Sequence, residues 1–424
     1  MNTIPALNKI SARDSNEPYR ASTTLELLFD LVYVIAVSAA ASGLHHRLLE
    51  HDFLGFLTFI IAFFILWNAW TSFTWFASGY DPDDWYYRLS VLLQMFGSLM
   101  IAANINQFFE QGLTWIGVTG YGIMRLASCS QWWRVYQQVE GHKRVAGRSI
   151  IGLLTLQSVW ILWLFLPASI QTPALFLFIA AELLMPIWAR AAQNINWHPH
   201  HMAERYGLLT IIVLGEGVLG VSNSIRTFLV NSESAASAII LLGSSLVALV
   251  FALWWLYFTI PFGTILDNER RRYDLFLFGY GHFFVFATLA ALGSALNLVT
   301  DAWANTLNST VTQPYAMGLL MIMLFGFLVT LTLLRALMCR KSSHNMTALI
   351  LATFIILLSY ITVAQGLSIT YGIWLSLLAP IIMTWYFHQD NKQWQAMASL
   401  SSNLILHDNN DLQKNSSLHY HNFF

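Results

Sequence analysis

The distribution of positive charge around the long apolar stretches constrains this chain most. Eighteen of its 21 Lys and Arg residues lie in the tails and in every second gap between those stretches. Arg47 and Arg226 lie in the opposite gaps, and Arg125 lies within a stretch. Cytoplasmic loops of membrane proteins carry an excess of Lys and Arg. The pattern therefore predicts an all-α polytopic transmembrane helical bundle with both termini in the cytoplasm.

Twelve apolar stretches are long enough to cross a hydrocarbon layer about 30 Å thick. They run over 24–44, 53–76, 89–109, 113–133, 149–166, 173–189, 206–224, 236–260, 275–298, 315–338, 346–365 and 369–387.

Composition agrees with a membrane protein and excludes several function classes. Charged residues make up 10% of the chain, against about 25% in soluble domains. A net charge of −1 and the lack of a long basic run give no sign of nucleic-acid binding. Phosphate-loop, zinc-protease and serine-hydrolase motifs are absent from the sequence, so we expect neither an enzyme nor a bound cofactor. The expected partners are the lipid bilayer and an unknown small solute or ion, and the oligomeric state stays open.

Four short patterns occur twice and indicate an internal duplication. The Trp-rich stretch 64–70 resembles 251–257, and an acidic loop follows each of them. Pro186 has a counterpart in Pro380, and Arg125-x-x-x-Cys129 resembles Arg335-x-x-x-Cys339.

These matches predict two parallel six-span repeats, related by an axis along the membrane normal. The expected organisation is an N-terminal tail 1–19, a first repeat 20–190, a linker 191–203, a second repeat 204–387 and a C-terminal tail 388–424. Chance similarity between apolar sequences is the alternative.

Charged residues inside the apolar stretches are the candidate functional residues. A charge at the centre of a span costs at least about 2.5–3.5 kcal/mol, so such residues usually face a protein interior or a water-filled cavity. The candidates for binding an ion or substrate are Glu26, Asp30, Arg125, Glu182, Glu204, Glu216 and His282.

Arg125 needs a carboxylate nearby because an arginine stays charged in any protein environment. We expect Glu216 or Glu182 to be that partner. The group is then either a structural ion pair that holds the bundle together or a site that loads protons or cations. We expect the acids to converge on one wettable chamber between the halves. His282 is expected to be an interhelical hydrogen-bonding residue more often than a ligand.

Glycines surround one of these acids. Gly215, Gly217 and Gly220 flank Glu216 and predict either close helix approach or a local break in the helix.

Two loops contain residues typical of metal ligands. Asp81-Pro82-Asp83-Asp84 could hold a hard cation, but Asp and Pro before a helix more often cap its first turn. His198-Pro199-His200-His201 lacks a second clustered ligand pair, which favours a solvated loop over a zinc site.

Two signature stretches give the chain a resemblance to a known family. Leu25-Glu26-Leu27-Leu28-Phe29-Asp30-Leu31-Val32 and the stretch from Glu204-Arg205-Tyr206-Gly207 to Gly215-Glu216 resemble the motifs of the bacterial low temperature requirement A family. The resemblance covers about residues 20–340. It implies a protein of the bacterial cytoplasmic (inner) membrane that is linked to growth in the cold, without implying a substrate or a reaction.

A fainter similarity concerns Arg20 and Phe29-Asp30-Leu31-Val32. They resemble the first-helix motif of potassium channels that are built from six-span repeats, although Leu28-Phe29-Asp30 departs from the Phe-Ser-Asp of those channels. The leading hypothesis from sequence is a proton- or cation-linked secondary transporter. A gated cation channel and a non-transporting sensor or scaffold are the alternatives.

Overall fold

The computed structural model describes residues 7–14, 17, 20–193, 195–231, 236–268, 272–304, 311–339 and 345–392, and over these residues it contains helices and loops without a strand. The predicted all-α fold is confirmed. The helices are α1 (Thr24–Leu49), α2 (Leu54–Tyr80), α3 (Trp85–Ala103), α4 (Ile105–Gln111), α5 (Trp115–Gln138), the short 3-10 helix η1 (Glu140–His142), α6 (Lys143–Trp163), α7 (Ala168–Arg190), α8 (Pro199–Asn231), α9 (Ala236–Phe258), α10 (Phe262–Asn268), α11 (Arg272–Ala304), α12 (Gln313–Cys339), α13 (Asn345–Ala364) and α14 (Ile369–Ser376), after which residues 378–392 are again helical. Most of the predicted C-terminal tail, 393–424, lies outside the described residues.

A helix lies at each of the twelve expected spans, but fewer meet the length and hydropathy expected of a membrane span. Ten helices of the described residues do, or eleven if α3 and α4 form one span bent by 49°. The helix at 113–133 is α5, which has 24 residues but a low mean hydropathy because it carries Arg125 and Arg134 among other polar groups. The count of twelve therefore stays a prediction.

Local sequence explains where several helices begin and break. Thr23 and Glu26 form a reciprocal capping box at the start of α1. Asp84 caps α3 by accepting a 2.8 Å hydrogen bond from the backbone N–H of Tyr87, which confirms the predicted role of the acidic loop. The bend between α3 and α4 lies at Asn104, whose side chain bonds Thr114, the cap of α5.

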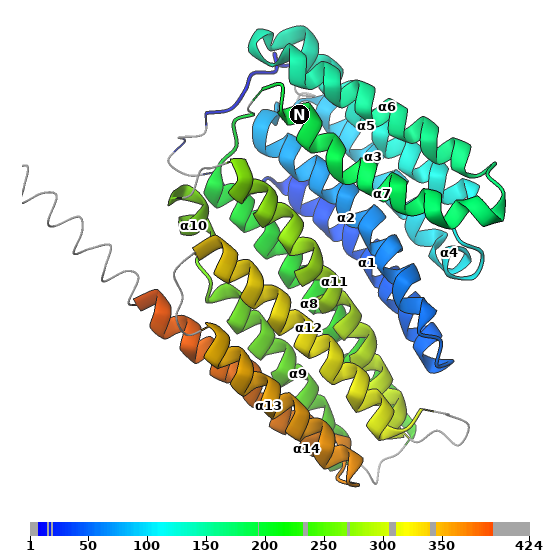
Figure 1. The fold of residues 1–424 in the computed structure, drawn as a ribbon, viewed down its shortest axis with the longest axis vertical. Coiled ribbons are helices and arrows are strands. Elements are labelled where there is room, and N and C mark those ends of the chain that lie inside the picture. The colour runs from blue at the N-terminus through cyan, green and yellow to red at the C-terminus, as the bar shows by residue number, and fades with distance from the viewer. Residues whose placement is uncertain are drawn as a thin grey trace, which may run out of the picture.

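Helices α1–α7 and α8–α14 form two halves that pack side by side (Figure 1), with α1 and α2 against α8 and α11. Neighbours follow the same order in each half. In the first half α1 contacts α2 and α3, and contacts then run from α3 to α5, α6 and α7. In the second half α8 contacts α9 and α11, and contacts then run from α11 to α12, α13 and α14. This parallel is what a duplication would produce, and the two-repeat organisation stays a prediction.

The chain segment before α1 lies across one end of the bundle. Ile10 is buried, and its N–H donates a 2.7 Å hydrogen bond to Gln138 at the end of α5. The N–H of Arg13 donates to Gly79 at the end of α2, and Asn196 donates to the Arg13 carbonyl. We call this end, where the predicted cytoplasmic loops gather, the basic end.

Aromatic rings fill the interface between the halves. Trp70 of α2 packs edge-on against Tyr206 of α8 at 5.0 Å and against Phe286 of α11 at 6.3 Å between ring centroids. Trp67 packs against Phe283 at 5.2 Å. Such pairs contribute about 0.5–1.5 kcal/mol each beyond the area they bury. The halves therefore meet through an aromatic layer, and polar groups cluster at particular positions along it.

The predicted orientation can be tested with two exposed residues. Arg144 at the start of α6 and Arg226 near the end of α8 are both exposed. We expect a membrane-impermeant maleimide added to intact spheroplasts to label Arg226→Cys and to spare Arg144→Cys, in a background with Cys129 and Cys339 replaced by Ala. Labelling of both residues from one side would contradict the orientation.

Candidate functional site

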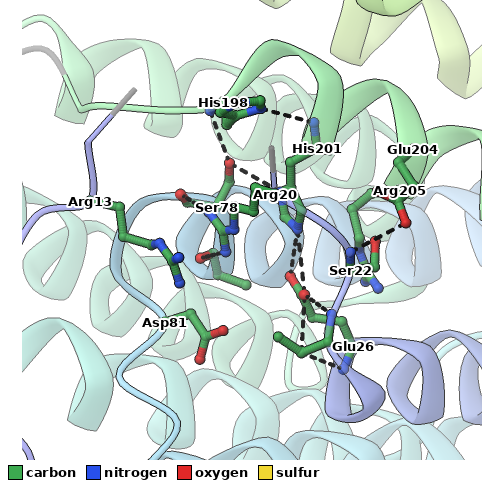
Figure 2. A network of polar contacts seen from close by, with 12 residues as sticks. Arg13, Arg20, Ser22, Glu26, Ser78, Asp81, His198, His201, Glu204 and Arg205 are labelled. Carbon is green, nitrogen blue, oxygen red and sulfur yellow. Dashed lines mark hydrogen bonds and ion pairs between the residues drawn. The ribbon is translucent and has the colours of Figure 1, made fainter. Parts of the chain in front are cut away.

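The first polar cluster lies at the basic end and joins the two halves (Figure 2). Glu26 of α1 accepts 2.8 Å and 3.0 Å hydrogen bonds from the N–H and hydroxyl of Thr23. Its other oxygen lies 3.1 Å from Nε2 of His201 on α8. Both side chains are buried, so one carboxylate caps its own helix and also contacts the opposite half.

Asp30 lies one helical turn after Glu26 and forms the second contact between the halves. Its Oδ1 accepts a 2.7 Å hydrogen bond from Arg205 of α8 and a 2.8 Å bond from the indole N–H of Trp70 on α2. Asp30 and Arg205 are both 0% exposed. The two charges compensate each other, whereas burying either one alone in lipid or in a dry protein interior would be strongly unfavourable.

Backbone carbonyls complete this cluster. Arg20, which precedes α1, donates to the carbonyls of Ala77 and Ser78 at the end of α2. The Ser78 hydroxyl lies 3.3 Å from Nδ1 of His201. Arg20, Glu26, Asp30, His201 and Arg205, with Ser78, are called the junction cluster below.

The prediction of a solvated loop at 198–201 was wrong. His198 is 5% exposed, His201 is 0% exposed, and α8 begins at Pro199. His198 lies 2.8 Å from the Glu17 carbonyl. These histidines are buried because the polar groups that end α2 and precede α1 provide hydrogen-bond partners for them. Among the described residues no group of three or more His, Cys, Asp or Glu side chains could hold a metal ion.

Glu204 lies beside the junction cluster and plays a smaller part than expected. It accepts a 3.2 Å hydrogen bond from the N–H of Ser22, just before α1, and it is half-buried. It therefore fixes the entry to α1 and remains in contact with the basic end.

The second cluster contains the deep arginine. Arg125 of α5 pairs with Glu182 of α7, which was one of its two expected partners. Glu182 also accepts a 2.6 Å hydrogen bond from Trp160 and a 3.2 Å bond from Asn68. The guanidinium lies 4.2 Å from the centre of the Tyr121 ring. Three further side chains thus surround one buried ion pair, and these five residues from four helices are here called the Arg125 cluster.

The same pairing recurs in the second half. Arg335 of α12 lies 3.2 Å from Asp390, in the helix that follows α14. Arg125 and Arg335 thus belong to corresponding helices, and so do their acidic partners. The paired arginines differ in depth, since Arg335 also contacts Asn345 at the start of α13 and Arg125 contacts the Leu153 carbonyl within α6.

A cavity extends from the Arg125 cluster toward the basic end. Asn68, which bonds Glu182, lines its inner part, and the half-buried Arg190 and Ile195 lie at its other end. The centre of a water molecule can move through about 80 Å³ of it. An ordered water needs roughly 10–15 Å³ on that measure, so the cavity has room for several. We call it the interface cavity because α2, α5, α6 and α7 line it from one half and α11 from the other.

Pro186 lines this cavity and weakens α7 beside the ion pair. A proline inside a helix has no N–H for the carbonyl four residues earlier, which here is that of Glu182. The Tyr280 hydroxyl of α11 donates a 2.8 Å hydrogen bond to the neighbouring Leu183 carbonyl. The wall of the cavity therefore contains a helix with a local weak point that is held by a bond between the halves.

Glu216 lies apart from both clusters, at the contact of α8 with α1. It is half-buried and accepts a 2.6 Å hydrogen bond from Ser38 of α1. The glycines around it permit close approach rather than a break, since α8 is continuous there. A Cβ at Gly220 would clash with the side chain of Asn297 on α11. Glu216 is thus a carboxylate at the interface that forms no ion pair with Arg125.

His282 belongs to a third, aromatic environment. Its Nε2 lies 3.0 Å from the Tyr257 hydroxyl and its Nδ1 lies 2.8 Å from the Phe278 carbonyl. The side chain is 0% exposed and packs between Tyr206 and Phe262. It joins α9 to α11, as expected of an interhelical hydrogen-bonding residue.

The predicted residues therefore gather at separate places instead of one chamber. Glu26, Asp30 and Glu204 lie at the junction, Arg125 and Glu182 lie beside the interface cavity, and Glu216 and His282 each lie elsewhere. The reason is that each of these pairs forms between packed helices, Asp30 with Arg205 at the junction of the halves and Arg125 with Glu182 within the first half, so compensation does not require one shared chamber.

Sequence reasoning missed Arg205, His201 and Arg20 as buried functional candidates. Arg205 was counted among the loop cations because it follows the linker, whereas α8 begins seven residues earlier than the predicted span. The spacing of His201 and Arg205, four residues apart, is the signal that could have placed them on one helical face.

The acidic loop 81–84 is held by basic partners. Asp84 lies 2.6 Å from Arg134 of α5, and Asp83 lies 2.9 Å from Arg88. Burial acts to raise the pKa of Asp84, but the hydrogen bond and charge of Arg134, together with hydrogen bonds from the backbone N–H groups of Tyr87 and Asn8, outweigh burial and lower it. Burial raises the pKa of Asp81 to about 6, and the nearby charge of Glu26 adds to that effect while Arg20 opposes it.

The Arg125 cluster generates a prediction about stability. Arg125→Gln and Glu182→Gln should each lower the free energy of unfolding by about 3–5 kcal/mol, because each leaves a buried charge without its partner. Arg125→Met combined with Glu182→Leu should cost less than either single change. Thermal unfolding of the purified proteins measures this, and Arg88→Gln at the exposed pair should leave the transition unchanged. Single changes that cost less than the double change would contradict it.

Asp81 generates a prediction about pH. The pKa of Asp81 is about 6 in the folded protein, against an ordinary 3.8, so the folded state binds the proton more tightly than the unfolded state. The free energy of unfolding therefore falls as the pH rises from about 4 to about 6. The melting temperature of the unmodified protein, relative to Asp81→Asn, should therefore fall across that window. Parallel melting curves for the two proteins at every pH would contradict the assignment.

Comparison with known proteins agrees with the helical membrane fold. Residues 21–383 match the family described as bacterial low temperature requirement A protein (LtrA). An uncharacterized protein of Rhizobium meliloti (strain 1021) is 24% identical over 326 residues, which cover 71% of this chain and 75% of that protein. The family match includes the junction cluster from Glu26 on and the whole Arg125 cluster. This chain belongs to the bacterial low temperature requirement A family of multi-pass membrane proteins.

Proposed function

We propose that this protein is a proton- or cation-linked secondary transporter of the bacterial inner membrane, with both termini in the cytoplasm. The observation that carries the proposal is the interface cavity, which runs from the basic end to a buried ion pair and has walls from both halves. Transporters with parallel repeats place their substrate sites at such interfaces, near mid-depth. A small solute would enter from the basic end and reach Asn68 beside Glu182.

Movement of the two halves relative to each other would change contacts in the wall of the cavity. The bond from Tyr280 to the Leu183 carbonyl crosses the interface at the level where Pro186 weakens α7. Movement of α11 away from α7 would break this bond and widen the cavity. It would also alter the contact of Asn68 with Glu182, so that solute binding and the ion pair would be coupled.

Glu216 is the best candidate for a residue that carries the coupling proton or cation. Glu182 and Asp30 each form an ion pair with an arginine, so neutralising either carboxylate would leave a buried arginine without its partner. Glu216 has a hydroxyl partner instead and is half-buried at the contact of α1 with α8. Protonation there would change the contact between the halves without leaving an arginine unpaired.

A non-transporting sensor or scaffold is the second candidate, and the junction cluster favours it. Asp30 and Arg205 are sealed from solvent at 0% exposure and join the halves as a structural pair would. Under this alternative the charges serve packing and register alone. The two functions differ in what happens when a carboxylate is neutralised.

Proteoliposomes that enclose a pH-sensitive dye test the transport proposal. Organic anions, amines and neutral solutes are added one at a time under an imposed pH gradient. We expect one class to give a saturable change in internal pH, and Glu216→Gln to reduce its initial rate at least about tenfold, the effect of losing a proton carrier. Glu50→Gln, an exposed acid at the end of α1, is the matched control and should keep the rate.

The outcomes separate the candidate functions. Saturable, solute-dependent proton movement that Glu216→Gln abolishes supports the carrier. Ion flux without solute and without saturation supports a channel instead. Absence of any flux from well-folded protein, together with full growth of Glu216→Gln cells in the cold, would support the scaffold and refute transport.

A further inference from the structure

The second half carries an open groove of about 1060 Å³, which lies between α8, α9 and the helical residues that follow α14. Its walls include large apolar side chains that are nevertheless exposed, among them Phe251, Trp255 and Ile381. On membrane-spanning helices such side chains favour contact with hydrocarbon. The groove is therefore a surface for an apolar molecule within the bilayer.

The groove is deep because one side chain is missing from its wall. Gly215 of α8 lines it, and a Cβ there would meet no atom of the surrounding helices within 4 Å. The nearby Gly217 differs, since a Cβ there would lie 3.3 Å from Leu296 of α11. Gly215 thus faces open space on one side of α8, whereas Gly217 faces the neighbouring helix. A larger residue at Gly215 would fill the groove.

The length of the groove matches one leaflet of a membrane. Its wall on α9 runs from Ala248 to Thr259, and its wall after α14 runs from Leu377 to His388. At 1.5 Å per residue each row is about 16 Å long. Half of a hydrocarbon layer about 30 Å thick is about 15 Å. One acyl chain of the leaflet at the basic end therefore has the length that the groove accommodates.

The end of the groove at the basic end is polar and lies beside a cation. Thr259, Thr384 and His388 line it there. Asn391 donates a 2.7 Å hydrogen bond to the Thr259 carbonyl, which fixes the last helix to the end of α9. Lys392 follows His388 by one turn, and both are exposed on one face of this helix. A lysine at the membrane surface attracts the headgroup of an anionic lipid.

We propose that this groove binds one anionic phospholipid, with an acyl chain along Gly215 and the headgroup beside His388 and Lys392. The acyl chain then packs against the turn of α8 from which Glu216 bonds Ser38 of α1. This binding does not depend on the proposed transport function.

Two lipids with the same acyl chains and different headgroups test the site. Dioleoyl-phosphatidylglycerol is anionic, and dioleoyl-phosphatidylcholine is zwitterionic. Each is titrated into the purified full-length protein in detergent, and native mass spectrometry counts the lipid molecules that remain bound. We expect saturable retention of one phosphatidylglycerol per chain. The concentration for half occupancy should be about fivefold higher for phosphatidylcholine, the effect of one lysine near an anionic headgroup.

A matched pair of glycines locates the acyl chain. Gly215→Leu should raise the concentration for half occupancy at least about tenfold, because overfilling a packed site is strongly unfavourable. Gly147→Leu is the control and should keep lipid binding. Gly147 is also half-buried in a helix, α6, and a Cβ there would lie 3.6 Å from the Tyr136 ring, an ordinary contact. Ala248→Leu narrows the groove from α9 and serves if Gly215→Leu does not fold.

A matched pair of lysines locates the headgroup. Lys392→Gln should remove the preference for phosphatidylglycerol over phosphatidylcholine. Lys143→Gln, at another exposed lysine of the basic end, should keep that preference.

Each result decides for or against the proposal. Failure of the unmodified protein to retain a lipid, equal retention of the two lipids, or equal losses in Gly147→Leu and Gly215→Leu would overturn it. Lipid-free dimers that Gly215→Leu converts to monomers would assign the groove to a second copy of the chain instead. Lipid binding that meets every expectation, in protein that moves no protons in proteoliposomes, would support the lipid site and refute the transport function alone.

Discussion

Charge compensation inside an apolar medium is the constraint on which this structure depends. Asp30 and Arg205 are completely buried and belong to different halves of the chain, so neither half can bury its own charge alone. Removing one member of such a pair costs far more than the pair contributes to stability, because the other charge is then left in a medium that cannot solvate it. Burial of both charges therefore requires the contact of α1 with α8, and the aromatic pair of Trp70 with Tyr206 packs at the same contact between the halves.

Much of the fold could be predicted because lipid imposes simple rules. Apolar stretches of membrane-crossing length gave helices at every expected position, and Asp84 capped α3 as Asp before a helix does. Glu182 was one of two expected partners for Arg125, since a deep arginine requires a carboxylate. The count of spans was harder to predict because α5 carries two arginines and α3 bends at Asn104, so hydropathy and helix length disagree there.

The arrangement of the acids could not be predicted from spacing along the chain. Helical periodicity places Glu26 and Asp30 on one face, but it does not say which helix covers that face. Arg205 and His201 looked like loop residues because the first two turns of α8 are polar, yet the end of α2 contacts His201 and α1 contacts Arg205. Because burying a charge is costly, the acids were expected to share one water-filled chamber. In the structure, pairing with a nearby arginine or histidine offsets that cost in separate clusters instead.

The segment before α1 has a consequence for how the molecule is assembled. Its partners lie at the ends of α2 and α5 and in the connection between the halves, since Arg13 bonds both Gly79 and Asn196. The bonds to Gln138 and Gly79 lie within the first half, whereas the bond from Asn196 can form only after the connection that follows α7 has been made. The N-terminal segment therefore gains its last hydrogen bond from chain that is synthesised after the whole first half.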